Sequence, residues 1–254
     1  MAQQDRIGGE ERSLIVRHAY PAEDHVEDQV GNSRQHSQFS TLDEATRRLF
    51  LERCRLVAIE PGRSVFLQGD KHSDSYIIKS GTVRTFYVAD SGREITLGHW
   101  SKGDLVGGPS IFGGGCHIWS AVATKQTQVF AITGPALREL AATNPQIYPW
   151  IIDVLSFKLS WLSILFQIHG TEHVQERLIK LLIMLGDCFG SAQHSGIIIE
   201  QKISQTDLAS LVGASRQWTN KTLGHLKSIG LIAMRDGKII LQDGNGLKAM
   251  IGSQ

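Results

Sequence analysis

The pattern of hydrophobic and polar residues changes twice along the chain. Between about residues 54 and 133, short runs rich in β-branched and aromatic residues alternate with turn signals such as Pro61-Gly62 and Gly69-Asp70. Strands separated by glycine-bearing turns every roughly 8–12 residues are typical of a sandwich or barrel and not of a parallel sheet. The pattern therefore predicts an all-β domain in the first half of the chain.

A helical pattern follows the β-rich stretch. Asn144 can cap the N-terminus of a helix, and Pro145 suits its first position, where a missing N–H costs nothing. From there to about residue 168 the sequence shows one narrow polar stripe and two apolar stripes. The apolar stripe with coiled-coil spacing consists of Trp150, Val154, Phe157, Trp161, Ile164 and Ile168. The other apolar stripe consists of Ile152, Leu155, Leu159, Leu162 and Phe166.

A helix with two apolar stripes must bury both of them. One stripe can pack on the β domain of its own chain, and the other needs a second partner. The same helix of a second subunit meets this need, because a two-fold pairing buries identical stripes against each other. We therefore expect a dimerisation helix over residues 144–170, with the stripe that begins at Trp150 as the dimer interface. The alternative is a helix buried in the core of a monomer.

A stretch near the C-terminus has the pattern of two short helices joined by a tight turn. Ser204 with Asp207 three residues later forms a variant of the capping box, and Gly213 permits the left-handed backbone of the turn. Ser215 can cap the second helix. Two short strands follow, joined by Asp236-Gly237, which suits a type I′ hairpin turn. These features predict a winged helix-turn-helix.

The outward face of the second helix carries the groups that nucleic-acid recognition needs. Three cations and no acid lie between Ala214 and Ser228. In the major groove arginine can bind guanine bidentately, and glutamine or asparagine can do the same for adenine. Lysine and hydroxyl groups can hold phosphates. The predicted DNA-binding residues are Ser215, Arg216, Gln217, Thr219, Asn220 and Lys221.

The composition of the chain argues against several classes of function and of site. The chain has 26 basic and 25 acidic residues, so it is not coated with charge for non-specific nucleic-acid binding. Its 3 cysteines lie far apart without a CxxC pair, which argues against a disulfide framework, a zinc site and an iron–sulfur cluster. The polar start is no signal peptide, and no apolar run approaches the ~20 residues that span a bilayer. We expect a cytoplasmic protein without a membrane partner.

The first 37 residues differ in composition from the rest of the chain. They hold four arginines, seven acids and few large apolar residues. Such a segment cannot bury enough surface to offset the entropy cost of ordering, so we expect a mostly disordered tail over residues 1–37. The remaining domains are then expected at residues 38–143 (β domain), 144–170 (dimerisation helix) and 171–254 (winged helix-turn-helix).

From about residue 38 the chain resembles the Crp/Fnr family of bacterial transcription regulators. The resemblance rests on Gly81, Gly103-Asp104 and Gly107, on Asn144-Pro145 before the long helix, and on the sequence LASLVGASRQWTNKTLGHLKSIGLI. It implies an α+β fold with an N-terminal double-stranded β-roll (a jelly roll) similar to cyclic-nucleotide-binding domains, a dimerisation helix and a C-terminal winged helix-turn-helix. It also implies a homodimer that reads a palindromic operator in double-stranded DNA, with RNA polymerase as a further partner.

The expected effector pocket departs from that of family members that bind cyclic AMP. Those members have a glutamate for the ribose after the glycine that matches Gly107, and an arginine further on for the phosphate. Here the first position is Gly108, and the arginine is replaced by His117 or Ile118. Because both groups are missing, we predict no response to cyclic AMP. The candidate pocket residues are Gly107, Gly108, Cys116, His117, Ile118 and Trp119.

The sequence leaves open what the β domain senses. A small organic effector beside Trp119 and a regulator without effector are alternatives to haem, for which Cys116 or His117 would be the ligand. Adjacent residues on a strand point to opposite faces, so only one of the two would face the pocket. No other cofactor and no metal is expected. A cupin-like enzyme is disfavoured because His72, His99 and His117 form no HxH pair, and no catalytic residue is predicted.

The resemblance also bears on base recognition. Many family members have a glutamate where Gln217 stands, and a glutamate accepts a hydrogen bond from the amino group of cytosine. Glutamine favours adenine instead. We therefore expect the operator to differ from the common half-site of the family at this base pair.

Overall fold

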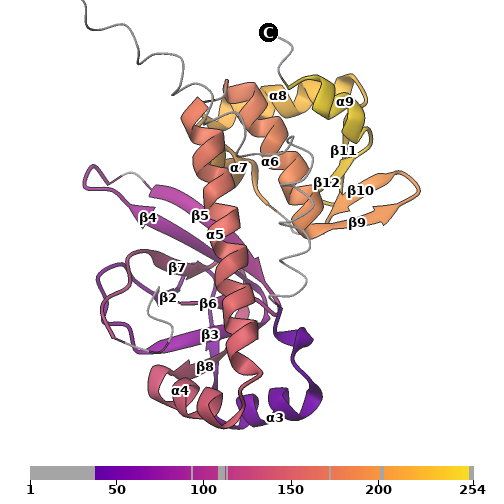
Figure 1. Ribbon diagram of the computed structural model, residues 1–254. Helices are drawn as coiled ribbons and strands as arrows, with labels where there is room; N and C mark the ends of the chain where they lie inside the picture. The colour runs from indigo at the N-terminus through magenta and orange to yellow at the C-terminus, as the bar shows by residue number, and fades with distance from the viewer. Residues whose placement is uncertain are drawn as a thin grey trace, which may run out of the picture.

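The computed structural model describes most of the chain from residue 38 onward. The described residues are 38–251 except 93, 108–111, 113, 172 and 201–202. The expected tail over residues 1–37 and Gly108 of the expected pocket lie outside them. The described part consists of an antiparallel β domain, a long helix that runs alongside it, and a C-terminal domain of helices and a small sheet (Figure 1). The predicted α+β fold class is confirmed.

Two antiparallel four-stranded sheets form the β domain. Its strands are β1 (Arg55–Ile59), β2 (Ser64–Phe66), β3 (Asp74–Ser80), β4 (Thr82–Val88), β5 (Glu94–Ser101), β6 (Leu105–Val106), β7 (Ser120–Ala123) and β8 (Thr127–Thr133). One sheet has the order β1-β8-β3-β6 and the other β2-β7-β4-β5, so the chain passes repeatedly from one sheet to the other. Gly81 joins β3 to β4 and has a φ of +96°. A Cβ at this position would lie 2.5 Å from Thr127 Cα.

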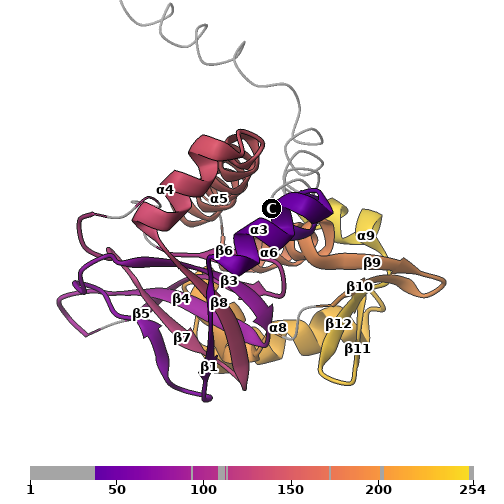
Figure 2. The ribbon, with the colours of Figure 1, turned by 90° about the horizontal axis from the view of Figure 1, so that it is seen from below.

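Short helices that the sequence pattern did not predict cover one end of the β-roll (Figure 2). They are the 3₁₀ turn η1 (Phe39–Thr41), α3 (Glu44–Glu52) and α4 (Gly134–Thr143). Asp43 caps α3 by accepting the Thr46 N–H at 2.9 Å. Phe39, Phe50 and Trp150 meet edge to face at centroid distances of 5.1 to 5.8 Å, which joins these helices to the next one.

The long helix α5 spans Ile147–Thr171 and reaches from the β-roll into the C-terminal domain (Figure 1). Its start corrects the prediction, because Asn144 does not cap α5. Asn144 instead ends α4, where its N–H donates to the Leu140 carbonyl at 2.9 Å. Pro145 disfavours helical backbone at Asn144, so the two helices are separated there.

The structure exchanges the expected roles of the two apolar stripes of α5. In the stripe proposed as dimer interface, Trp150, Val154, Phe157, Trp161 and Ile168 are buried within their own chain and Ile164 is half-buried. In the other stripe, Ile152 is 60%, Leu159 68% and Phe166 79% exposed. The assignment of the dimer interface to the stripe from Trp150 is therefore wrong, because the β-roll and the C-terminal domain already cover that stripe.

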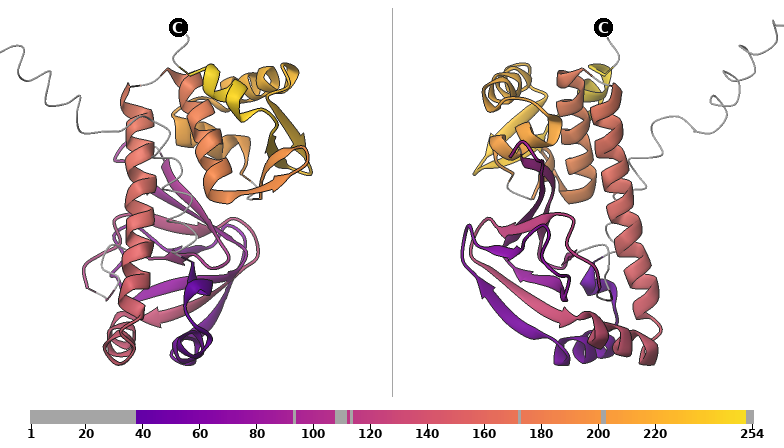
Figure 3. Two further views of the ribbon diagram at one scale, coloured as in Figure 1. Left: turned by 45° about the vertical axis from the view of Figure 1, so that its right-hand side comes forward. Right: turned by 90° about the vertical axis from the view of Figure 1, so that its left-hand side faces the viewer.

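Helix α5 is also more apolar than expected, since no apolar run of membrane-spanning length was predicted from the sequence. Residues Ile147–Gly170 are long and apolar enough to cross a membrane by length and composition alone, and 33% of the most apolar window is buried inside the structure. The right-hand view of Figure 3 shows α5 at the edge of the molecule, with the β-roll and the C-terminal domain on one side and no described element on the other. Much of the second apolar stripe of α5 is therefore left exposed by the part of the chain that the structure describes.

The C-terminal domain combines four helices with a four-stranded antiparallel sheet. Its elements are α6 (Val174–Phe189), β9 (Gly190–Gln193), β10 (Gly196–Ile199), α7 (Gln205–Val212), α8 (Arg216–Ser228), β11 (Ile232–Arg235), β12 (Lys238–Leu241) and α9 (Gly244–Ala249). The sheet order is β11-β12-β10-β9. Asp236 (φ +51°) and Gly237 (φ +75°) both adopt the left-handed backbone of the predicted type I′ turn.

Candidate nucleic-acid interface

Local signals in the sequence set the geometry of the helix pair α7 and α8. Ser204 Oγ accepts the Asp207 N–H at 3.1 Å, and Asp207 Oδ2 accepts the Ser204 N–H at 3.3 Å, which completes the predicted capping box. Gly213 follows α7 with a φ of +68°. A Cβ at this position would also lie 3.3 Å from His169 Cε1, so a side chain here meets both backbone strain and a tight contact.

Helix α8 presents a cationic face to solvent. Ser215 Oγ caps the helix by accepting the Trp218 N–H at 3.1 Å. Five of the six predicted DNA-binding residues are exposed, namely Ser215, Arg216, Gln217, Asn220 and Lys221. Among the residues that the structure describes, neither Arg216 nor Lys221 has an ion pair with a carboxylate. Both cations are therefore available to an external anion.

Thr219 is a correction to the predicted contact set. Its side chain is fully buried under α8, together with Leu223 and Leu226, and so cannot reach a nucleic acid in this arrangement. Trp218 is partly buried and packs against the same core. The two positions lie on the inward side of the helix, whereas Gln217 and Asn220 lie on the outward side.

Helix α7 is held by contacts on two sides. Toward the β-roll, Ser210 Oγ accepts the Thr96 N–H of β5 at 3.3 Å, and His99 Nε2 lies 3.5 Å from Asp207 Oδ1. Toward the long helices, His169 Nε2 lies 2.6 Å from the Leu211 carbonyl oxygen, and Arg177 Nη1 donates to the Val212 carbonyl at 3.4 Å. The first helix of the pair thus bridges the β-roll to α5 and α6.

The Asp207 carboxylate takes part in both the cap and the contact with the β-roll. Burial by itself raises the pKa of this group, but the hydrogen bond and charge of His99 and the hydrogen bonds of Ser204 outweigh it and lower the pKa to about 2. His99 is itself buried. A negative charge is thereby kept at the junction between β5 and α7 at neutral pH.

A small cavity, here called the interior cavity, lies between the β-roll and α5. Its volume is about 40 Å³, and Gly107 and Trp119 of the expected pocket line it. Trp100 also lines it; its Nε1 donates to Thr85 Oγ1 at 2.8 Å, and the Lys158 Nζ lies 3.5 Å from its ring centroid. Small-molecule sites enclose roughly 300–1,000 Å³. The cavity that the described residues line is therefore far smaller than such a site.

The remaining described residues of the expected pocket lie elsewhere. Cys116 is exposed, and Ile118 is 54% exposed. His117 is buried, with its ring stacked on Phe66 at a centroid distance of 3.8 Å and beside His72 at 4.5 Å. Neither Cys116 nor His117 lines the cavity. The described residues therefore do not fit the haem site that the sequence left open.

His117 has an unusual electrostatic environment. Burial, and after it the neighbouring His72, lower the pKa of His117 to about 4, so its ring is neutral at pH 7. As predicted, only one of the neighbours Cys116 and His117 faces the interior. That residue, His117, packs between Phe66 and His72 and does not line the cavity. Thr85, Trp100 and Lys158, which do surround the cavity, were missed because they come from two strands and a helix far apart in sequence.

The fold and the exposed helix define a class of protein, a DNA-binding regulator with a β-roll and a winged helix-turn-helix. Comparison with known families agrees with this class. Residues 56–144 match the cyclic nucleotide-binding domain, and residues 176–250 match the Crp-like helix-turn-helix domain. The chain belongs to the Crp/Fnr family of transcription regulators, whose members are not enzymes.

Curated relatives and solved structures support this assignment. The chain is 29% identical over 73% of its length to a CRP-like cAMP-activated global transcriptional regulator of Mycobacterium tuberculosis, and the match covers 83% of that protein. It is 23% identical over 76% of its length to the fumarate and nitrate reduction regulatory protein of Escherichia coli, with 77% of that protein covered.

Two solved structures share the fold at lower identity. A mutant of CooA from Carboxydothermus hydrogenoformans has a TM-score of 0.69 at 19% identity, covering 79% of this chain and 88% of that one. FixK2 from Bradyrhizobium japonicum has a TM-score of 0.68 at 17% identity, covering 79% and 98%.

Proposed function

We propose that the protein is a homodimeric regulator that reads a palindromic operator through two copies of α8. The observation that carries this proposal is the outward face of α8, on which Arg216, Gln217, Asn220 and Lys221 are exposed. Arg216 and Gln217 lie in the first turn, the part of a recognition helix that contacts base edges in the major groove. Lys221 lies one turn later and suits a phosphate.

The exposed stripe of α5 supports the homodimer. Tyr148, which is 40% exposed, precedes the stripe, and the positions 148, 152, 155, 159, 162 and 166 then repeat in steps of four and three. This is the spacing of a coiled-coil seam, in which each apolar side chain packs between residues of the facing helix. A second copy of α5 offers the same seam, and a two-fold axis makes it self-complementary. The revised interface is therefore the stripe that contains Ile152, Leu159 and Phe166.

Lack of a cyclic AMP response is part of the same proposal. A relative of this chain is cAMP-activated, but the cavity lined by Gly107 and Trp119 of the expected effector pocket measures about 40 Å³ and is flanked by Trp100 and Lys158. A nucleotide would have to displace the Trp100 ring, which is buried and hydrogen-bonded to Thr85. Contact with RNA polymerase and a cytoplasmic location complete the proposal, because a transcription regulator works where DNA is transcribed.

Binding-site selection with the purified full chain tests the proposal. We expect an enriched sequence with two-fold symmetry and half-sites about one helical turn apart, and a mass near 56 kDa, twice the 28.0 kDa of the chain. Affinity for the selected site should fall steeply with salt, because phosphate contacts release counterions. Selection of an asymmetric site by a 28.0 kDa species would contradict the homodimer, and failure to enrich any sequence would contradict the DNA-binding assignment. Calorimetry with cyclic AMP at micromolar to millimolar concentrations is expected to show no binding.

A further inference from the structure

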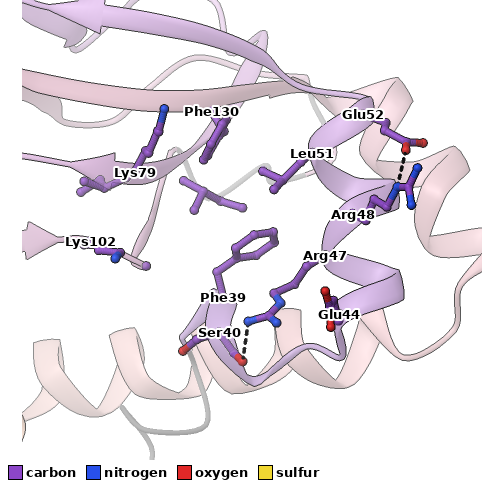
Figure 4. Close-up of a pocket in the computed structure, with 13 residues that line it drawn as sticks. Phe39, Ser40, Glu44, Arg47, Arg48, Leu51, Glu52, Lys79, Lys102 and Phe130 are labelled. Atoms are coloured by element: carbon purple, nitrogen blue, oxygen red, sulfur yellow. Dashed lines mark hydrogen bonds and ion pairs between the residues drawn. The ribbon is translucent and has the colours of Figure 1, made fainter.

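A second cavity lies on the outer face of the β-roll, away from α8 and from the interior cavity. It is an open groove of about 800 Å³ between α3, η1 and strands β3 and β8 (Figure 4). Phe39, Leu51 and Phe130 form an apolar floor, and charged side chains stand around its rim. We call it the α3 groove. Its volume falls in the range of roughly 300–1,000 Å³ that binding sites occupy.

The charges at the α3 end of the groove are satisfied within the chain. Arg48 Nε pairs with Glu52 Oε1 at 3.1 Å, and Arg47 Nη1 donates to the Ser40 carbonyl at 3.3 Å. Glu44 stands on the same helix beside them. Cations and carboxylates are thus balanced on this side, which leaves no excess charge to attract a partner.

The opposite end of the groove has an excess of positive charge. Lys79 at the end of β3 and Lys102 in the turn after β5 both stand on this side (Figure 4). Both side chains are exposed, and within the described ranges no carboxylate pairs with either. The Lys79 Nζ lies 5.6 Å from the centroid of Phe130. This end therefore offers two cations beside an apolar floor, which suits an anionic partner with apolar groups.

The chain enters the described structure at this same end. The Phe39 N–H donates to the Gly103 carbonyl at 3.1 Å, and the Gln38 side chain comes within 3.9 Å of where a Cβ on Gly103 would be. Gly103 follows Lys102 directly, so residues 1–37 join the structure beside the unpaired cations.

Residues 1–37 contain a segment of opposite charge within reach. Residues 23–28 read EDHVED, with four carboxylates and no lysine or arginine. Gln38 lies ten positions after residue 28, and a chain of ten steps spans up to about 33–36 Å. The nine residues of α3 extend only about 14 Å. The acidic segment can therefore reach any point of the groove.

We propose that the α3 groove is a docking site for the acidic segment 23–28 of the same chain. Its carboxylates pair with Lys79 and Lys102, and Val26 contacts the apolar floor. Tethering raises the effective concentration of the segment to the millimolar range, so contacts too weak to hold a free peptide hold this one. The segment then covers the outer surface of α3, whose Phe50 packs on Trp150 of α5.

Zero-length carbodiimide cross-linking of the full chain tests the proposal directly. The reagent joins a carboxylate to a lysine amine with loss of water, and peptide mass spectrometry locates the bond. We expect residues 23–28 to link to Lys79 and Lys102 at least about tenfold more often than to Lys71 and Lys125, exposed lysines of the β-roll that do not line the groove. Equal yields on all four lysines, or no link to Lys79 and Lys102, would overturn the proposal. A mixture of isotope-labelled and unlabelled chains separates links within a chain from links between chains, and links only between chains would also overturn it.

A proteolysis experiment gives a second measure that does not depend on lysine chemistry. A glutamate-specific protease cuts after Glu23 and Glu27, and docking protects both bonds. In K79Q/K102Q we expect the cleavage rate to rise about five- to tenfold, while the matched surface variant K71Q/K125Q keeps the rate of the original chain. All four lysines are exposed, so an unchanged circular dichroism spectrum is expected throughout. Equal cleavage rates in the original chain and both variants would contradict docking.

Discussion

Replacement of Leu159 by glutamate is the sharpest test of the proposed dimer seam. Leu159 is 68% exposed in the single chain and lies at the centre of the stripe between Leu155 and Leu162. Complete burial of a leucine contributes about 1.5–3 kcal/mol. For a side chain two-thirds exposed before association, the loss is about 1–2 kcal/mol in each subunit. Because the two-fold axis counts the change twice, L159E costs about 3 kcal/mol of dimer stability before charge repulsion is added.

A loss of about 3 kcal/mol corresponds to a rise of more than a hundredfold in the dimer dissociation constant. Sedimentation velocity over a dilution series measures this constant. L56E is the matched control, because Leu56 is a 51% exposed leucine on β1, outside the α5 seam. We expect L56E to remain a dimer at concentrations where L159E is monomeric. If the original chain is a dimer and L159E and L56E dissociate alike, the seam has been assigned to the wrong face of α5; an original chain that is monomeric at all concentrations would contradict the homodimer itself.

Further predictions concern base recognition, the junction at α7 and the buried histidine. R216A should lower affinity for the selected operator about ten- to a hundredfold in fluorescence anisotropy, whereas Q217E should shift base preference at one position of each half-site from adenine toward cytosine; an identical selected motif for Q217E and the original chain would refute the role of Gln217. D207N should weaken the cap of α7 and the contact with His99. Because the pKa of Asp207 is lowered from the ordinary 3.8 to about 2 in the folded chain, its contribution of about 2 kcal/mol to stability is present above pH 4 and is lost as the pH falls toward 2. Acid unfolding followed by circular dichroism should show less of this loss in D207N. The pKa of His117 is lowered from 6.5 to about 4 in the folded chain. Its contribution to the free energy of unfolding is therefore complete above pH 6.5, and about 2 kcal/mol of it is lost between pH 7 and pH 5. H117F, which keeps a ring on Phe66, should reduce this loss in denaturant titrations at the two pH values, and an unchanged loss would show that other groups cause it.

The sequence was most informative where structure depends on neighbours a few positions apart. The capping residues Ser204 and Ser215 and the left-handed turn at Gly213 act through local backbone geometry, and all three are found as predicted. The type I′ turn at Asp236-Gly237 is of the same kind. The prediction for Thr219 in the same region was wrong. Helical periodicity alone does not decide the burial of a residue at the edge of a helical face, and Thr219 lies on the buried face with Leu223 and Leu226.

The sequence was least informative where two candidate surfaces share one spacing. Both apolar stripes of α5 repeat in steps of four and three, so periodicity could not tell which one the chain covers itself. The decision comes from distant partners, such as the Leu97 carbonyl of β5, which accepts the Trp161 Nε1 hydrogen at 2.8 Å. The prediction of the residues around the interior cavity failed because Trp100 and Lys158 are far apart in the sequence and meet only in the folded chain.

The position of α7 shows how the parts of this regulator are mechanically connected. One side of α7 contacts β5 through Thr96 and His99, and its C-terminal end contacts α5 and α6 through His169 and Arg177. Only the short turn at Gly213 and Ala214 separates α7 from α8, and Leu223 and Leu226 of α8 pack in the same core as α7. A helix pair packed in this way moves as a unit, because a close-packed core has few alternative arrangements. We therefore expect the direction in which α8 faces to be set jointly by the β-roll and by the long helix that carries the proposed dimer seam. A change at Asp207, such as D207N, should therefore lower affinity for the whole operator, although Asp207 lies outside the DNA-facing surface. The same change should not alter affinity for an isolated half-site, because the spacing of two α8 helices does not matter there.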